Sequence, residues 1–310
     1  MDDSATLRLV TFVAAVAAAC AAGAGGFLVR GTTAVPAAGW AAAAALALAA
    51  EMGGRAAGVL ADPAAAEGVR LAVAALGLCP AMSLLGAKRP QHGVWQFIVA
   101  ALAAMLTLPA ATAALTRPGM VPDVLDLQRG FMTLLVLVGW MNFAGTRHGV
   151  PAALVAVGQM QLMRPFLPFV PSAAEAPGSD CVAALLVAGG ALAAAGISAF
   201  RPVTVGGRVG IAASIDGPFL ALRETLGAAW ALRIAERFNA TAEARGWPCR
   251  LRFAGLDAGG DPTDSGWHRD AIRCLRALLL RFVSHEWLAR HEAAIRDPNA
   301  PVLAHTRGER

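Results

Sequence analysis

The sequence predicts an all-α polytopic membrane helix bundle with six to seven transmembrane helices, followed by a small C-terminal α+β soluble domain. Of the 310 residues, 57% are hydrophobic and 15% are charged, against about 25% charged in ordinary soluble domains. Long uncharged runs fill residues 1–200, which hold 10 Lys and Arg and 9 Asp and Glu. Residues 201–310 hold 16 Lys and Arg and 12 Asp and Glu, so we expect the domain boundary at Arg201-Pro202.

Six uncharged runs are long enough, or nearly so, to cross a bilayer. A hydrocarbon core about 30 Å thick needs roughly 20 apolar residues in a helix, and backbone groups without water must bond within that helix. The predicted spans are residues 9–29, 32–50, 71–87, 93–115, 130–146 and 181–200. The run 71–87 is short, but Arg70 and Lys88 flank it, and their long side chains can reach the interface.

The first two spans each have an alternative. Residues 9–29 have the length of a span rather than a signal peptide, and two Asp precede them. A signal peptide usually has a shorter apolar stretch after a positively charged segment, so we expect a retained span. Residues 32–50 contain 11 Ala among 19 residues, which is weakly hydrophobic and compatible with a buried soluble helix. The neighbouring spans favour a membrane helix.

A seventh segment, residues 150–170, has two interpretations. Residues 150–163 are apolar apart from two glutamines, but Arg164 and three prolines follow, and proline breaks a regular helix. The segment is either a short tilted span or a re-entrant half-helix followed by an extended interfacial stretch. The sequence favours the span, which gives seven transmembrane helices rather than six.

Loop character predicts the orientation. With seven spans, Arg30, Lys88-Arg89, Arg147 and the tail share one side, where the loops are short and free of acid. The other side receives longer loops with acidic residues: Glu51, Asp62, Glu67, Asp123, Asp126, Glu175 and Asp180. The Lys and Arg counts of the two sides are nearly equal, so the positive-inside rule adds little. We place the C-terminal domain in the cytoplasm and the N-terminus outside a bacterial-type inner (plasma) membrane.

The tail is predicted to be a small α+β unit. Asp216, with Pro218 just after it, is a typical helix start, and apolar residues then recur at spacings of three and four. Residues 249–256 alternate apolar and polar side chains, as a strand does. The expected elements are a partner strand at 208–214, a helix from Asp216 to about Arg245, a strand at 249–256, a loop at 257–266 and a helix at about 267–296.

No catalytic, metal or cofactor site is predicted. His285 and His291 are six residues apart, whereas a zinc-binding helix needs two His four apart on one face. Asp257, Asp261 and Asp264 lack the alternate spacing of a calcium loop. The five Cys have no paired spacing, and neither a phosphate-binding glycine pattern nor a nucleophile elbow occurs. The sequence therefore does not favour an enzyme.

Polar side chains inside the predicted spans are the candidate functional residues of the bundle, because such groups are costly in lipid. The residues that would line a transport pathway are Asn142, Gln159, Gln161 and Arg164. Amides often simply bond between helices. A proton relay would need a carboxylate or His in mid-span, and Glu51 and His92 are expected at span edges.

The tail carries candidate contacts to lipid headgroups or to a partner. They are Arg250 and Arg252 on the predicted strand, and Arg269, Arg273 and Arg276 on the second predicted helix. Each basic residue near an anionic membrane surface contributes about 1 kcal/mol, and ordinary ion pairing with nearby acids is the alternative. Nucleic acid is not expected, because aromatic residues do not interleave with these charges.

These observations favour an alanine-rich, multi-pass membrane anchor or scaffold that presents its cytoplasmic domain to a partner and has no catalysis of its own. Trp230, Trp267 and Trp287 are the expected partner-binding residues. Small residues repeated in the first and last spans predict close helix packing, with self-association or another membrane protein as partner. The alternative is a transporter or channel-like protein with a pathway around residues 142–164. We expect the lipid bilayer as a partner and no cofactor.

Overall fold

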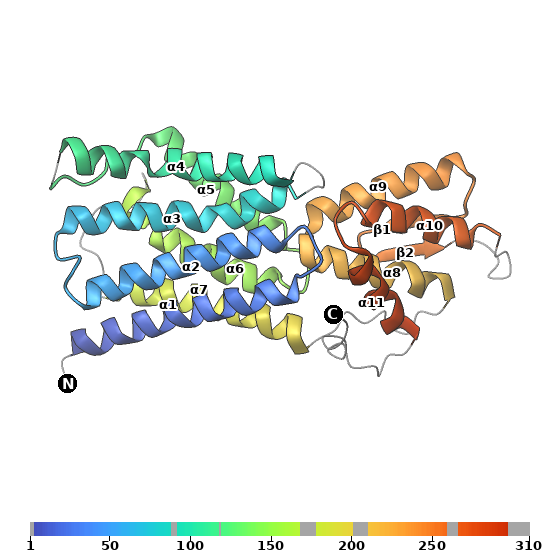
Figure 1. The fold of residues 1–310 in the computed structure, drawn as a ribbon, viewed down its shortest axis with the longest axis horizontal. Helices are drawn as coiled ribbons and strands as arrows, with labels where there is room; N and C mark the ends of the chain where they lie inside the picture. Colours follow the sequence, from blue (N-terminus) through green and yellow to red (C-terminus); the bar gives the residue numbers. More distant parts are fainter. Residues whose placement is uncertain are drawn as a thin grey trace, which may run out of the picture. The chain divides into compact units, whose positions relative to one another are not determined.

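The computed structural model describes residues 3–87, 92–117, 119–167, 178–200, 210–258 and 266–296. The chain divides into two compact units. The N-terminal unit is Met1–Val29 with Ala34–Arg201, and the C-terminal unit is Arg30–Thr33 with Pro202–Arg310. Over the described ranges the fold is mostly helical, with eleven α-helices and one two-stranded sheet (Figure 1). The mostly helical fold and the small sheet agree with the sequence prediction.

The N-terminal unit is a set of helices that lie side by side (Figure 1). They are α1 (Asp3–Leu28), α2 (Val35–Ala56), α3 (Pro63–Leu85), α4 (His92–Thr116), α5 (Asp126–Met141), α6 (Gly149–Leu162) and α7 (Ser179–Phe200), with a 3-10 turn at Arg164–Phe166. The central helix is α3, because it packs against α2, α4, α5 and α6. In turn, α1 packs against α2 and α7.

Among the described residues, five helices are long and apolar enough to cross a membrane: α1, α2, α3, α4 and α7. The predicted count of six to seven spans therefore differs from the structure. Of the run 130–146, residues 130–141 belong to α5, a helix of 16 residues. The segment 150–170 contributes to α6, of 14 residues, and to the 3-10 turn, with residues 168–170 outside the described part. Turn chemistry shortens α5, because the Thr146 hydroxyl bonds to the backbone of Phe143 and His148.

Two of the long helices extend past the apolar runs that predict them. Helix α2 continues beyond residue 50 through Glu51 and Arg55, and α3 begins at Pro63 rather than at residue 71. Asp62 caps α3, because its carboxylate accepts hydrogen bonds from the amides of the next turn at 3.2 and 3.3 Å. These extensions place charged residues inside the two helices, whereas hydropathy alone predicts that those residues lie in the loop between them.

Small residues let the backbones of neighbouring helices approach closely. One core cluster is formed by buried alanines alone: Ala14 and Ala18 of α1, Ala45 of α2, and Ala184 and Ala188 of α7. Gly190 acts similarly between α6 and α7, because a Cβ atom at this position would lie 2.7 Å from the Pro151 carbonyl oxygen. Close approach increases van der Waals contact, which drives helix association in lipid.

Large apolar side chains are exposed on the outside of the N-terminal unit. Phe97, Leu115 and Leu127 are 75%, 84% and 85% exposed. Soluble monomers rarely present large contiguous apolar surfaces to water. This surface suits contact with lipid chains.

The C-terminal unit combines helices with a hairpin. Its described elements are α8 (Gly210–Leu226), α9 (Ala228–Ala244), β1 (Cys249–Arg252), β2 (Gly255–Ala258), α10 (His268–Leu279) and α11 (His285–Arg296). Phe219, Leu222, Phe238 and Leu275 are at most 1% exposed and lie in its core. The unit thus buries apolar side chains from α8, α9 and α10, and α11 adds Trp287 and Leu288.

Several boundaries predicted for this unit are wrong. Helix α8 already begins at Gly210, so Asp216 lies inside a helix and residues 210–214 are not a strand, while 201–209 lie outside the described part. The single helix expected up to Arg245 is divided at Gly227, whose φ of +83° suits glycine. Likewise the helix expected over 267–296 is divided between α10 and α11.

The strand β1 pairs with β2 in an antiparallel hairpin instead of pairing with residues 208–214. Two polar side chains attach this hairpin to the helices. The Asn239 amide donates to Leu251 O at 2.8 Å and accepts from Leu251 N at 2.7 Å. The buried Asp216 carboxylate accepts from Leu256 N at 2.5 Å. These bonds satisfy backbone groups at a sheet edge, which explains how two short strands persist.

The connection between α1 and α2, Arg30–Thr33, belongs to the C-terminal unit. Thr32 forms an isolated antiparallel bridge with Val283. Beside it, Ser284 N donates to Gly31 O at 2.7 Å. The C-terminal unit is therefore completed by a segment from near the start of the chain.

Candidate functional site

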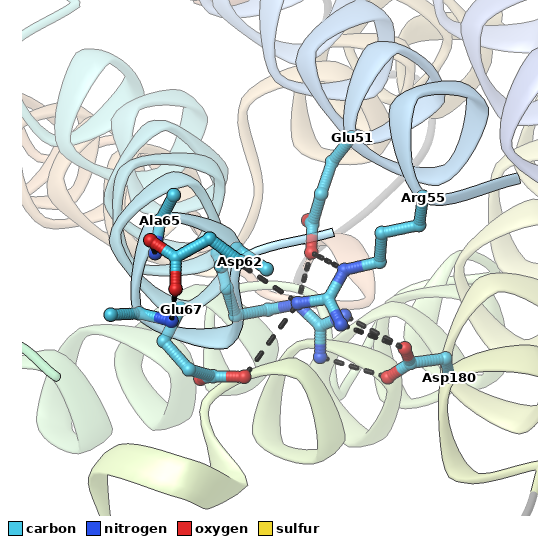
Figure 2. Close-up of polar contacts among 9 residues, drawn as sticks. Glu51, Arg55, Asp62, Ala65, Glu67 and Asp180 are labelled. Carbon is cyan, nitrogen blue, oxygen red and sulfur yellow. Dashed lines mark hydrogen bonds and ion pairs between the residues drawn. The ribbon is translucent and has the colours of Figure 1, made fainter. Parts of the chain in front are cut away.

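The strongest concentration of charge in the described part of the N-terminal unit is a cluster of five side chains. We call it the ion cluster: Glu51 and Arg55 of α2, Glu67 and Arg70 of α3, and Asp180 of α7. Figure 2 shows Glu51, Arg55, Glu67 and Asp180 pointing toward one another, and the five residues come from α2, α3 and α7. The cluster joins segments that are distant in the sequence.

Arg70 is the centre of the ion cluster and is only 1% exposed. Its Nε donates to Glu51 Oε1 at 2.5 Å. Its Nη1 and Nη2 donate to the two oxygens of Asp180 at 2.8 and 2.9 Å, the bidentate geometry that binds a carboxylate most strongly. One buried guanidinium thus bonds to the side chains of two other helices.

Arg55 forms the outer part of the ion cluster, with a side chain that is 23% exposed. Its Nε donates to the same Glu51 oxygen at 3.1 Å, and its other nitrogens lie 3.6 Å from Glu67 and 3.9 Å from Asp180. These longer contacts connect the Glu67 and Asp180 carboxylates to α2 (Figure 2).

Local sequence explains how each helix supplies its charges. Glu51 and Arg55 are four residues apart, so they share one face of α2. The Asp62 cap fixes the start of α3, which places Arg70 about two turns into the helix. Asp180 lies in the first turn of α7, where the helix dipole favours a negative charge.

The arrangement is an electrostatic clamp rather than a metal site. Three carboxylates face two guanidinium groups, and both oxygens of Asp180 and one of Glu51 bond to Arg70. The second Glu51 oxygen is buried and has no hydrogen-bond partner among the described residues. Within those residues, no group of three His, Cys, Asp or Glu side chains could hold a metal ion.

Sequence reasoning missed this cluster. It placed Glu51, Glu67 and Asp180 in loops and treated Arg70 as a side chain that reaches the interface, but Arg70 is buried and paired. One feature of the sequence did indicate the cluster: the three acids, Arg55 and Arg70 all lie next to predicted spans on the same side of the membrane. Their contacts depend on helices being adjacent, and the sequence does not give adjacency.

A neutral polar group joins α2, α3 and α4. Gln96 Oε1 accepts from Trp40 Nε1 at 2.8 Å and from Ser83 Oγ at 3.1 Å. This explains why a tryptophan lies inside the run 32–50 rather than at its edge. Bonds of this kind link helices, at about 0.6 kcal/mol each on average in a membrane protein.

The four predicted pathway residues are not all brought together. Gln159 donates to Gly77 O of α3. Gln161 and Arg164 instead line an apolar groove of about 580 Å³ between α5 and α6. Asn142 follows the last residue of α5, at the opposite end of α6 from Arg164. Only Gln161 and Arg164 share a site.

The five predicted tail arginines are all exposed, and their pairing differs. Arg252 lies 2.9 Å from Asp257, Arg273 lies 3.5 Å from Asp270, and Arg276 lies 3.2 Å from Glu292. Within the described ranges, the Arg250 and Arg269 guanidinium groups form no ion pair. These two are the arginines best suited to contact another molecule.

Two of the expected partner-binding tryptophans are core residues. Trp230 and Trp287 are 8% and 3% exposed, while Trp267 is half-buried. Trp230 packs against Phe282, and Trp287 stacks on His291 with ring centroids 3.8 Å apart. Trp230 and Trp287 therefore stabilise the C-terminal unit from within.

Of the other suspected residues, His291 and Cys249 are half-buried. His291 Nδ1 donates to Trp287 O at 2.8 Å, and burial lowers the pKa of its ring below 6.5. Burial also raises the pKa of the Cys249 thiol to about 11, which disfavours the reactive thiolate. Asp257 lies in β2, and Asp261 and Asp264 lie outside the described residues.

Comparison with protein-family models, with curated proteins and with solved structures finds no match to this chain.

Proposed function

We propose that this chain is a multi-pass membrane anchor or scaffold that presents its C-terminal unit to a protein partner. The five long apolar helices and the apolar outer surface of the N-terminal unit support the membrane location. The buried ion cluster supports a static role, because breaking a buried charge pair costs several kcal/mol. A bundle clamped in this way suits an anchor.

The observation that carries the proposal is the composition of the C-terminal unit. It has its own apolar core and also contains Arg30–Thr33. Three chain connections therefore join it to the N-terminal unit, at residues 29–30, 33–34 and 201–202. A domain tethered by one linker would need only one of them. Multiple connections suit a domain that is attached to the membrane unit at more than one point of the chain.

The partner surface that we propose includes Arg250 and Arg269. Both are exposed, and neither is in an ion pair within the described part of the chain. Rim charges of this kind guide association with an acidic surface. The partner is accordingly a protein with an acidic surface or a second copy of this chain.

The test is stoichiometric co-purification with the full-length protein in mild detergent. Wild type is compared with the double variant Arg250→Ala/Arg269→Ala. The matched control is Arg273→Ala/Arg276→Ala, which also removes two charges but takes them from arginines already paired with acids. We expect the first variant to lose most of the partner and the control to retain it.

Two results would contradict these proposals, the first the scaffold itself and the second the partner surface. One is a wild-type protein that purifies from its native membrane without any stoichiometric partner or second copy. The other is equal recovery of the partner with both double variants, because the contact would then not involve Arg250 and Arg269.

We further propose the plasma (inner) membrane as the location, with the C-terminal unit in the cytoplasm. The short connections on that side, which include Arg30 and Arg147, are basic and free of acid. The support is the absence of acid from these connections rather than a surplus of Lys and Arg, because the two sides hold nearly equal numbers of basic residues. The acidic loops then face outside.

A transporter is the second candidate, favoured by one observation. Gln161 and Arg164 line the same groove between α5 and α6. An ionisable residue at such a site is a candidate functional residue in membrane proteins. Substrate flux into proteoliposomes that is lost in Arg164→Ala would favour transport over the scaffold.

A further inference from the structure

We propose that the groove between α5 and α6 binds the acyl chain of an anionic phospholipid, with the lipid phosphate held by Arg164. This inference rests on the proposed membrane location and does not depend on a protein partner. It assigns a specific ligand to a site that scaffolding alone does not require.

The shape of the groove fits a lipid chain. Its walls are apolar and include Leu137 and Trp140 of α5 and Val157 and Met160 of α6. The lining residues of α6 and its following turn run from Ala153 to Arg164, a length of about 16 Å at the helical rise. Leu137 and Val157 are 45% and 50% exposed, so the groove opens to the outside of the N-terminal unit. In a membrane, that outside is lipid.

The polar groups lie toward one end of this apolar groove. Gln161 and Arg164 are the last lining positions of α6 and the 3-10 turn before Leu167. Among the described residues, no acid pairs with the Arg164 guanidinium. By contrast Arg70 and Arg55, in the same unit, are paired with carboxylates. Arg164 therefore has no acidic counter-ion among the described residues, so a bound ligand would have to provide one.

The C-terminal end of α6 and the N-terminal end of α5 lie part-way along longer neighbouring helices. At the C-terminal end of α6, Gln159 bonds to Gly77, near the middle of α3. At the N-terminal end of α5, Gln128 donates to Leu106 O at 2.7 Å, well before α4 ends at Thr116. Arg164 follows the last residue of α6 by two positions, and an arginine next to lipid without a carboxylate partner favours an anionic ligand, since an unpaired charge there is costly.

A phospholipid provides an apolar chain for the groove and an anion for Arg164 in one molecule. Its chain fills an apolar groove, and its phosphate offers oxygens that match the fork of N–H donors on a guanidinium. A water-soluble anion would satisfy Arg164 but leave the apolar walls uncovered. Charge complementarity therefore favours an anionic lipid over a zwitterionic one.

The test is lipid binding by the purified full-length protein in detergent, followed by native mass spectrometry. Phosphatidylglycerol and phosphatidylcholine with the same acyl chains are titrated separately. We expect wild type to prefer phosphatidylglycerol, and Arg164→Ala to weaken that binding about fivefold, the factor expected for one Arg at an anionic surface. Arg164→Lys should retain part of the preference.

Two further variants separate the groove from non-specific binding. Arg117→Ala removes an exposed charge near the end of α4, outside the groove, and should leave binding unchanged. Ala153→Phe should fill the groove and weaken binding of both lipids. Thermal unfolding of each variant verifies that the protein is folded, so a loss of binding can be assigned to the site.

Three outcomes would overturn the proposal: equal binding of both lipids by wild type, unchanged phosphatidylglycerol binding in Arg164→Ala, or displacement of the lipid by inorganic phosphate alone. The last would identify a soluble-anion site. A failure of the proposed function appears separately, as a chain that is extracted from membranes by alkaline carbonate or that has no partner.

Discussion

At the scale of single residues, burial decides what each arginine of the N-terminal unit does. Arg70 is 1% exposed and bonds to two carboxylates. Arg129 pairs with Asp126 at 3.1 Å, but the Asp126 side chain is 85% exposed. Exposed pairs contribute at most about 1 kcal/mol, whereas removing one partner of a buried pair leaves an uncompensated charge. The two pairs therefore predict different mutational costs.

Replacing Arg70 by Met should destabilise the protein by about 3–5 kcal/mol, because Glu51 and Asp180 would stay buried without their cation. The measurement is thermal unfolding in detergent, with Arg129→Met as control, which should change stability by about 1 kcal/mol or less. A triple change, Arg70→Met with Glu51→Gln and Asp180→Asn, should recover part of the loss. Equal stability of Arg70→Met and wild type would contradict the clamp.

His291 makes the C-terminal unit sensitive to acid. Burial lowers the pKa of its ring in the folded state below the 6.5 of an exposed His, and the neighbouring Arg290 acts in the same direction. Above pH 6.5 both folded and unfolded forms are neutral, so the residue adds no pH dependence. Below pH 6.5 the His291 ring is protonated in the unfolded state before it is protonated in the folded state. The free energy of unfolding therefore decreases as the pH falls.

The corresponding measurement is thermal unfolding from pH 7.5 to 5, followed by tryptophan fluorescence because Trp287 stacks on His291. His291→Gln should show a smaller loss at acid pH than wild type. His285 is exposed, and His285→Gln should reproduce the wild-type profile. Identical profiles for wild type and His291→Gln would rule out this source of acid sensitivity.

At the scale of elements, short segments with special geometry decide how the C-terminal unit is completed. Gly31 has a φ of +81°, and a Cβ atom there would lie 2.8 Å from Ser284 Oγ and 3.3 Å from Trp287 Cβ. The bridge between Thr32 and Val283 begins beside it. Gly31 thus permits both the turn after α1 and the close approach of the α11 segment.

Gly31→Ala should weaken the bridge and expose the Ser284 amide, which bonds to Gly31 O. Gly58→Ala is the matched control, because Gly58 has a similar φ of +73° with no atom within 4 Å of the added Cβ. A positive φ costs each Ala about 1–2 kcal/mol, so the difference between the variants measures the steric contact. Hydrogen exchange over residues 282–288 should increase in Gly31→Ala and remain unchanged in Gly58→Ala. Unchanged exchange in both would show that the contact is dispensable.

At the scale of the whole molecule, helix pairing constrains the topology. Helices α5 and α6 pack together and are joined by residues 142–148, a length typical of a connection between antiparallel helices. As a pair, both cross the membrane or neither does. If the five long helices span the bilayer as we propose, the chain crosses it five times, or seven times if α5 and α6 also cross. Both counts are odd, so the proposal places the residues after α7 opposite the N-terminus. Arg30–Thr33, after one crossing, falls on the same side as the rest of the C-terminal unit.

This topology predicts opposite labelling of two positions in a variant whose five native Cys are replaced by Ala. Met120→Cys and Leu232→Cys are suitable because these residues are 57% and 53% exposed. A membrane-impermeant maleimide should label residue 120 in intact cells and residue 232 only after permeabilisation. Labelling of both from the same side would show that α5 and α6 do not act as a pair. The reverse pattern would keep the odd count but place the C-terminal unit outside.

Much of the fold follows from local pattern. Uncharged runs predicted the five long apolar helices, and alternation near residue 250 predicted β1. Boundaries were less accurate, because hydropathy ended α2 before Glu51 and started α3 after Arg70, although both residues are helical and buried. Apolar length also predicted spans for α5 and α6, where side-chain bonding at Thr146 and the proline after Arg164 shorten the helices.

Local sequence pattern establishes that this protein is largely helical, has several apolar helices of membrane-spanning length and contains a more charged, partly β region after residue 201. These properties depend on residues near one another in the chain. Which charges meet depends instead on tertiary packing. The ion cluster takes its residues from α2, α3 and α7, the groove combines α5 with α6, and Arg30–Thr33 joins a unit formed mainly after residue 201. Each depends on which helices are neighbours, a result of packing over the whole chain that no local spacing records.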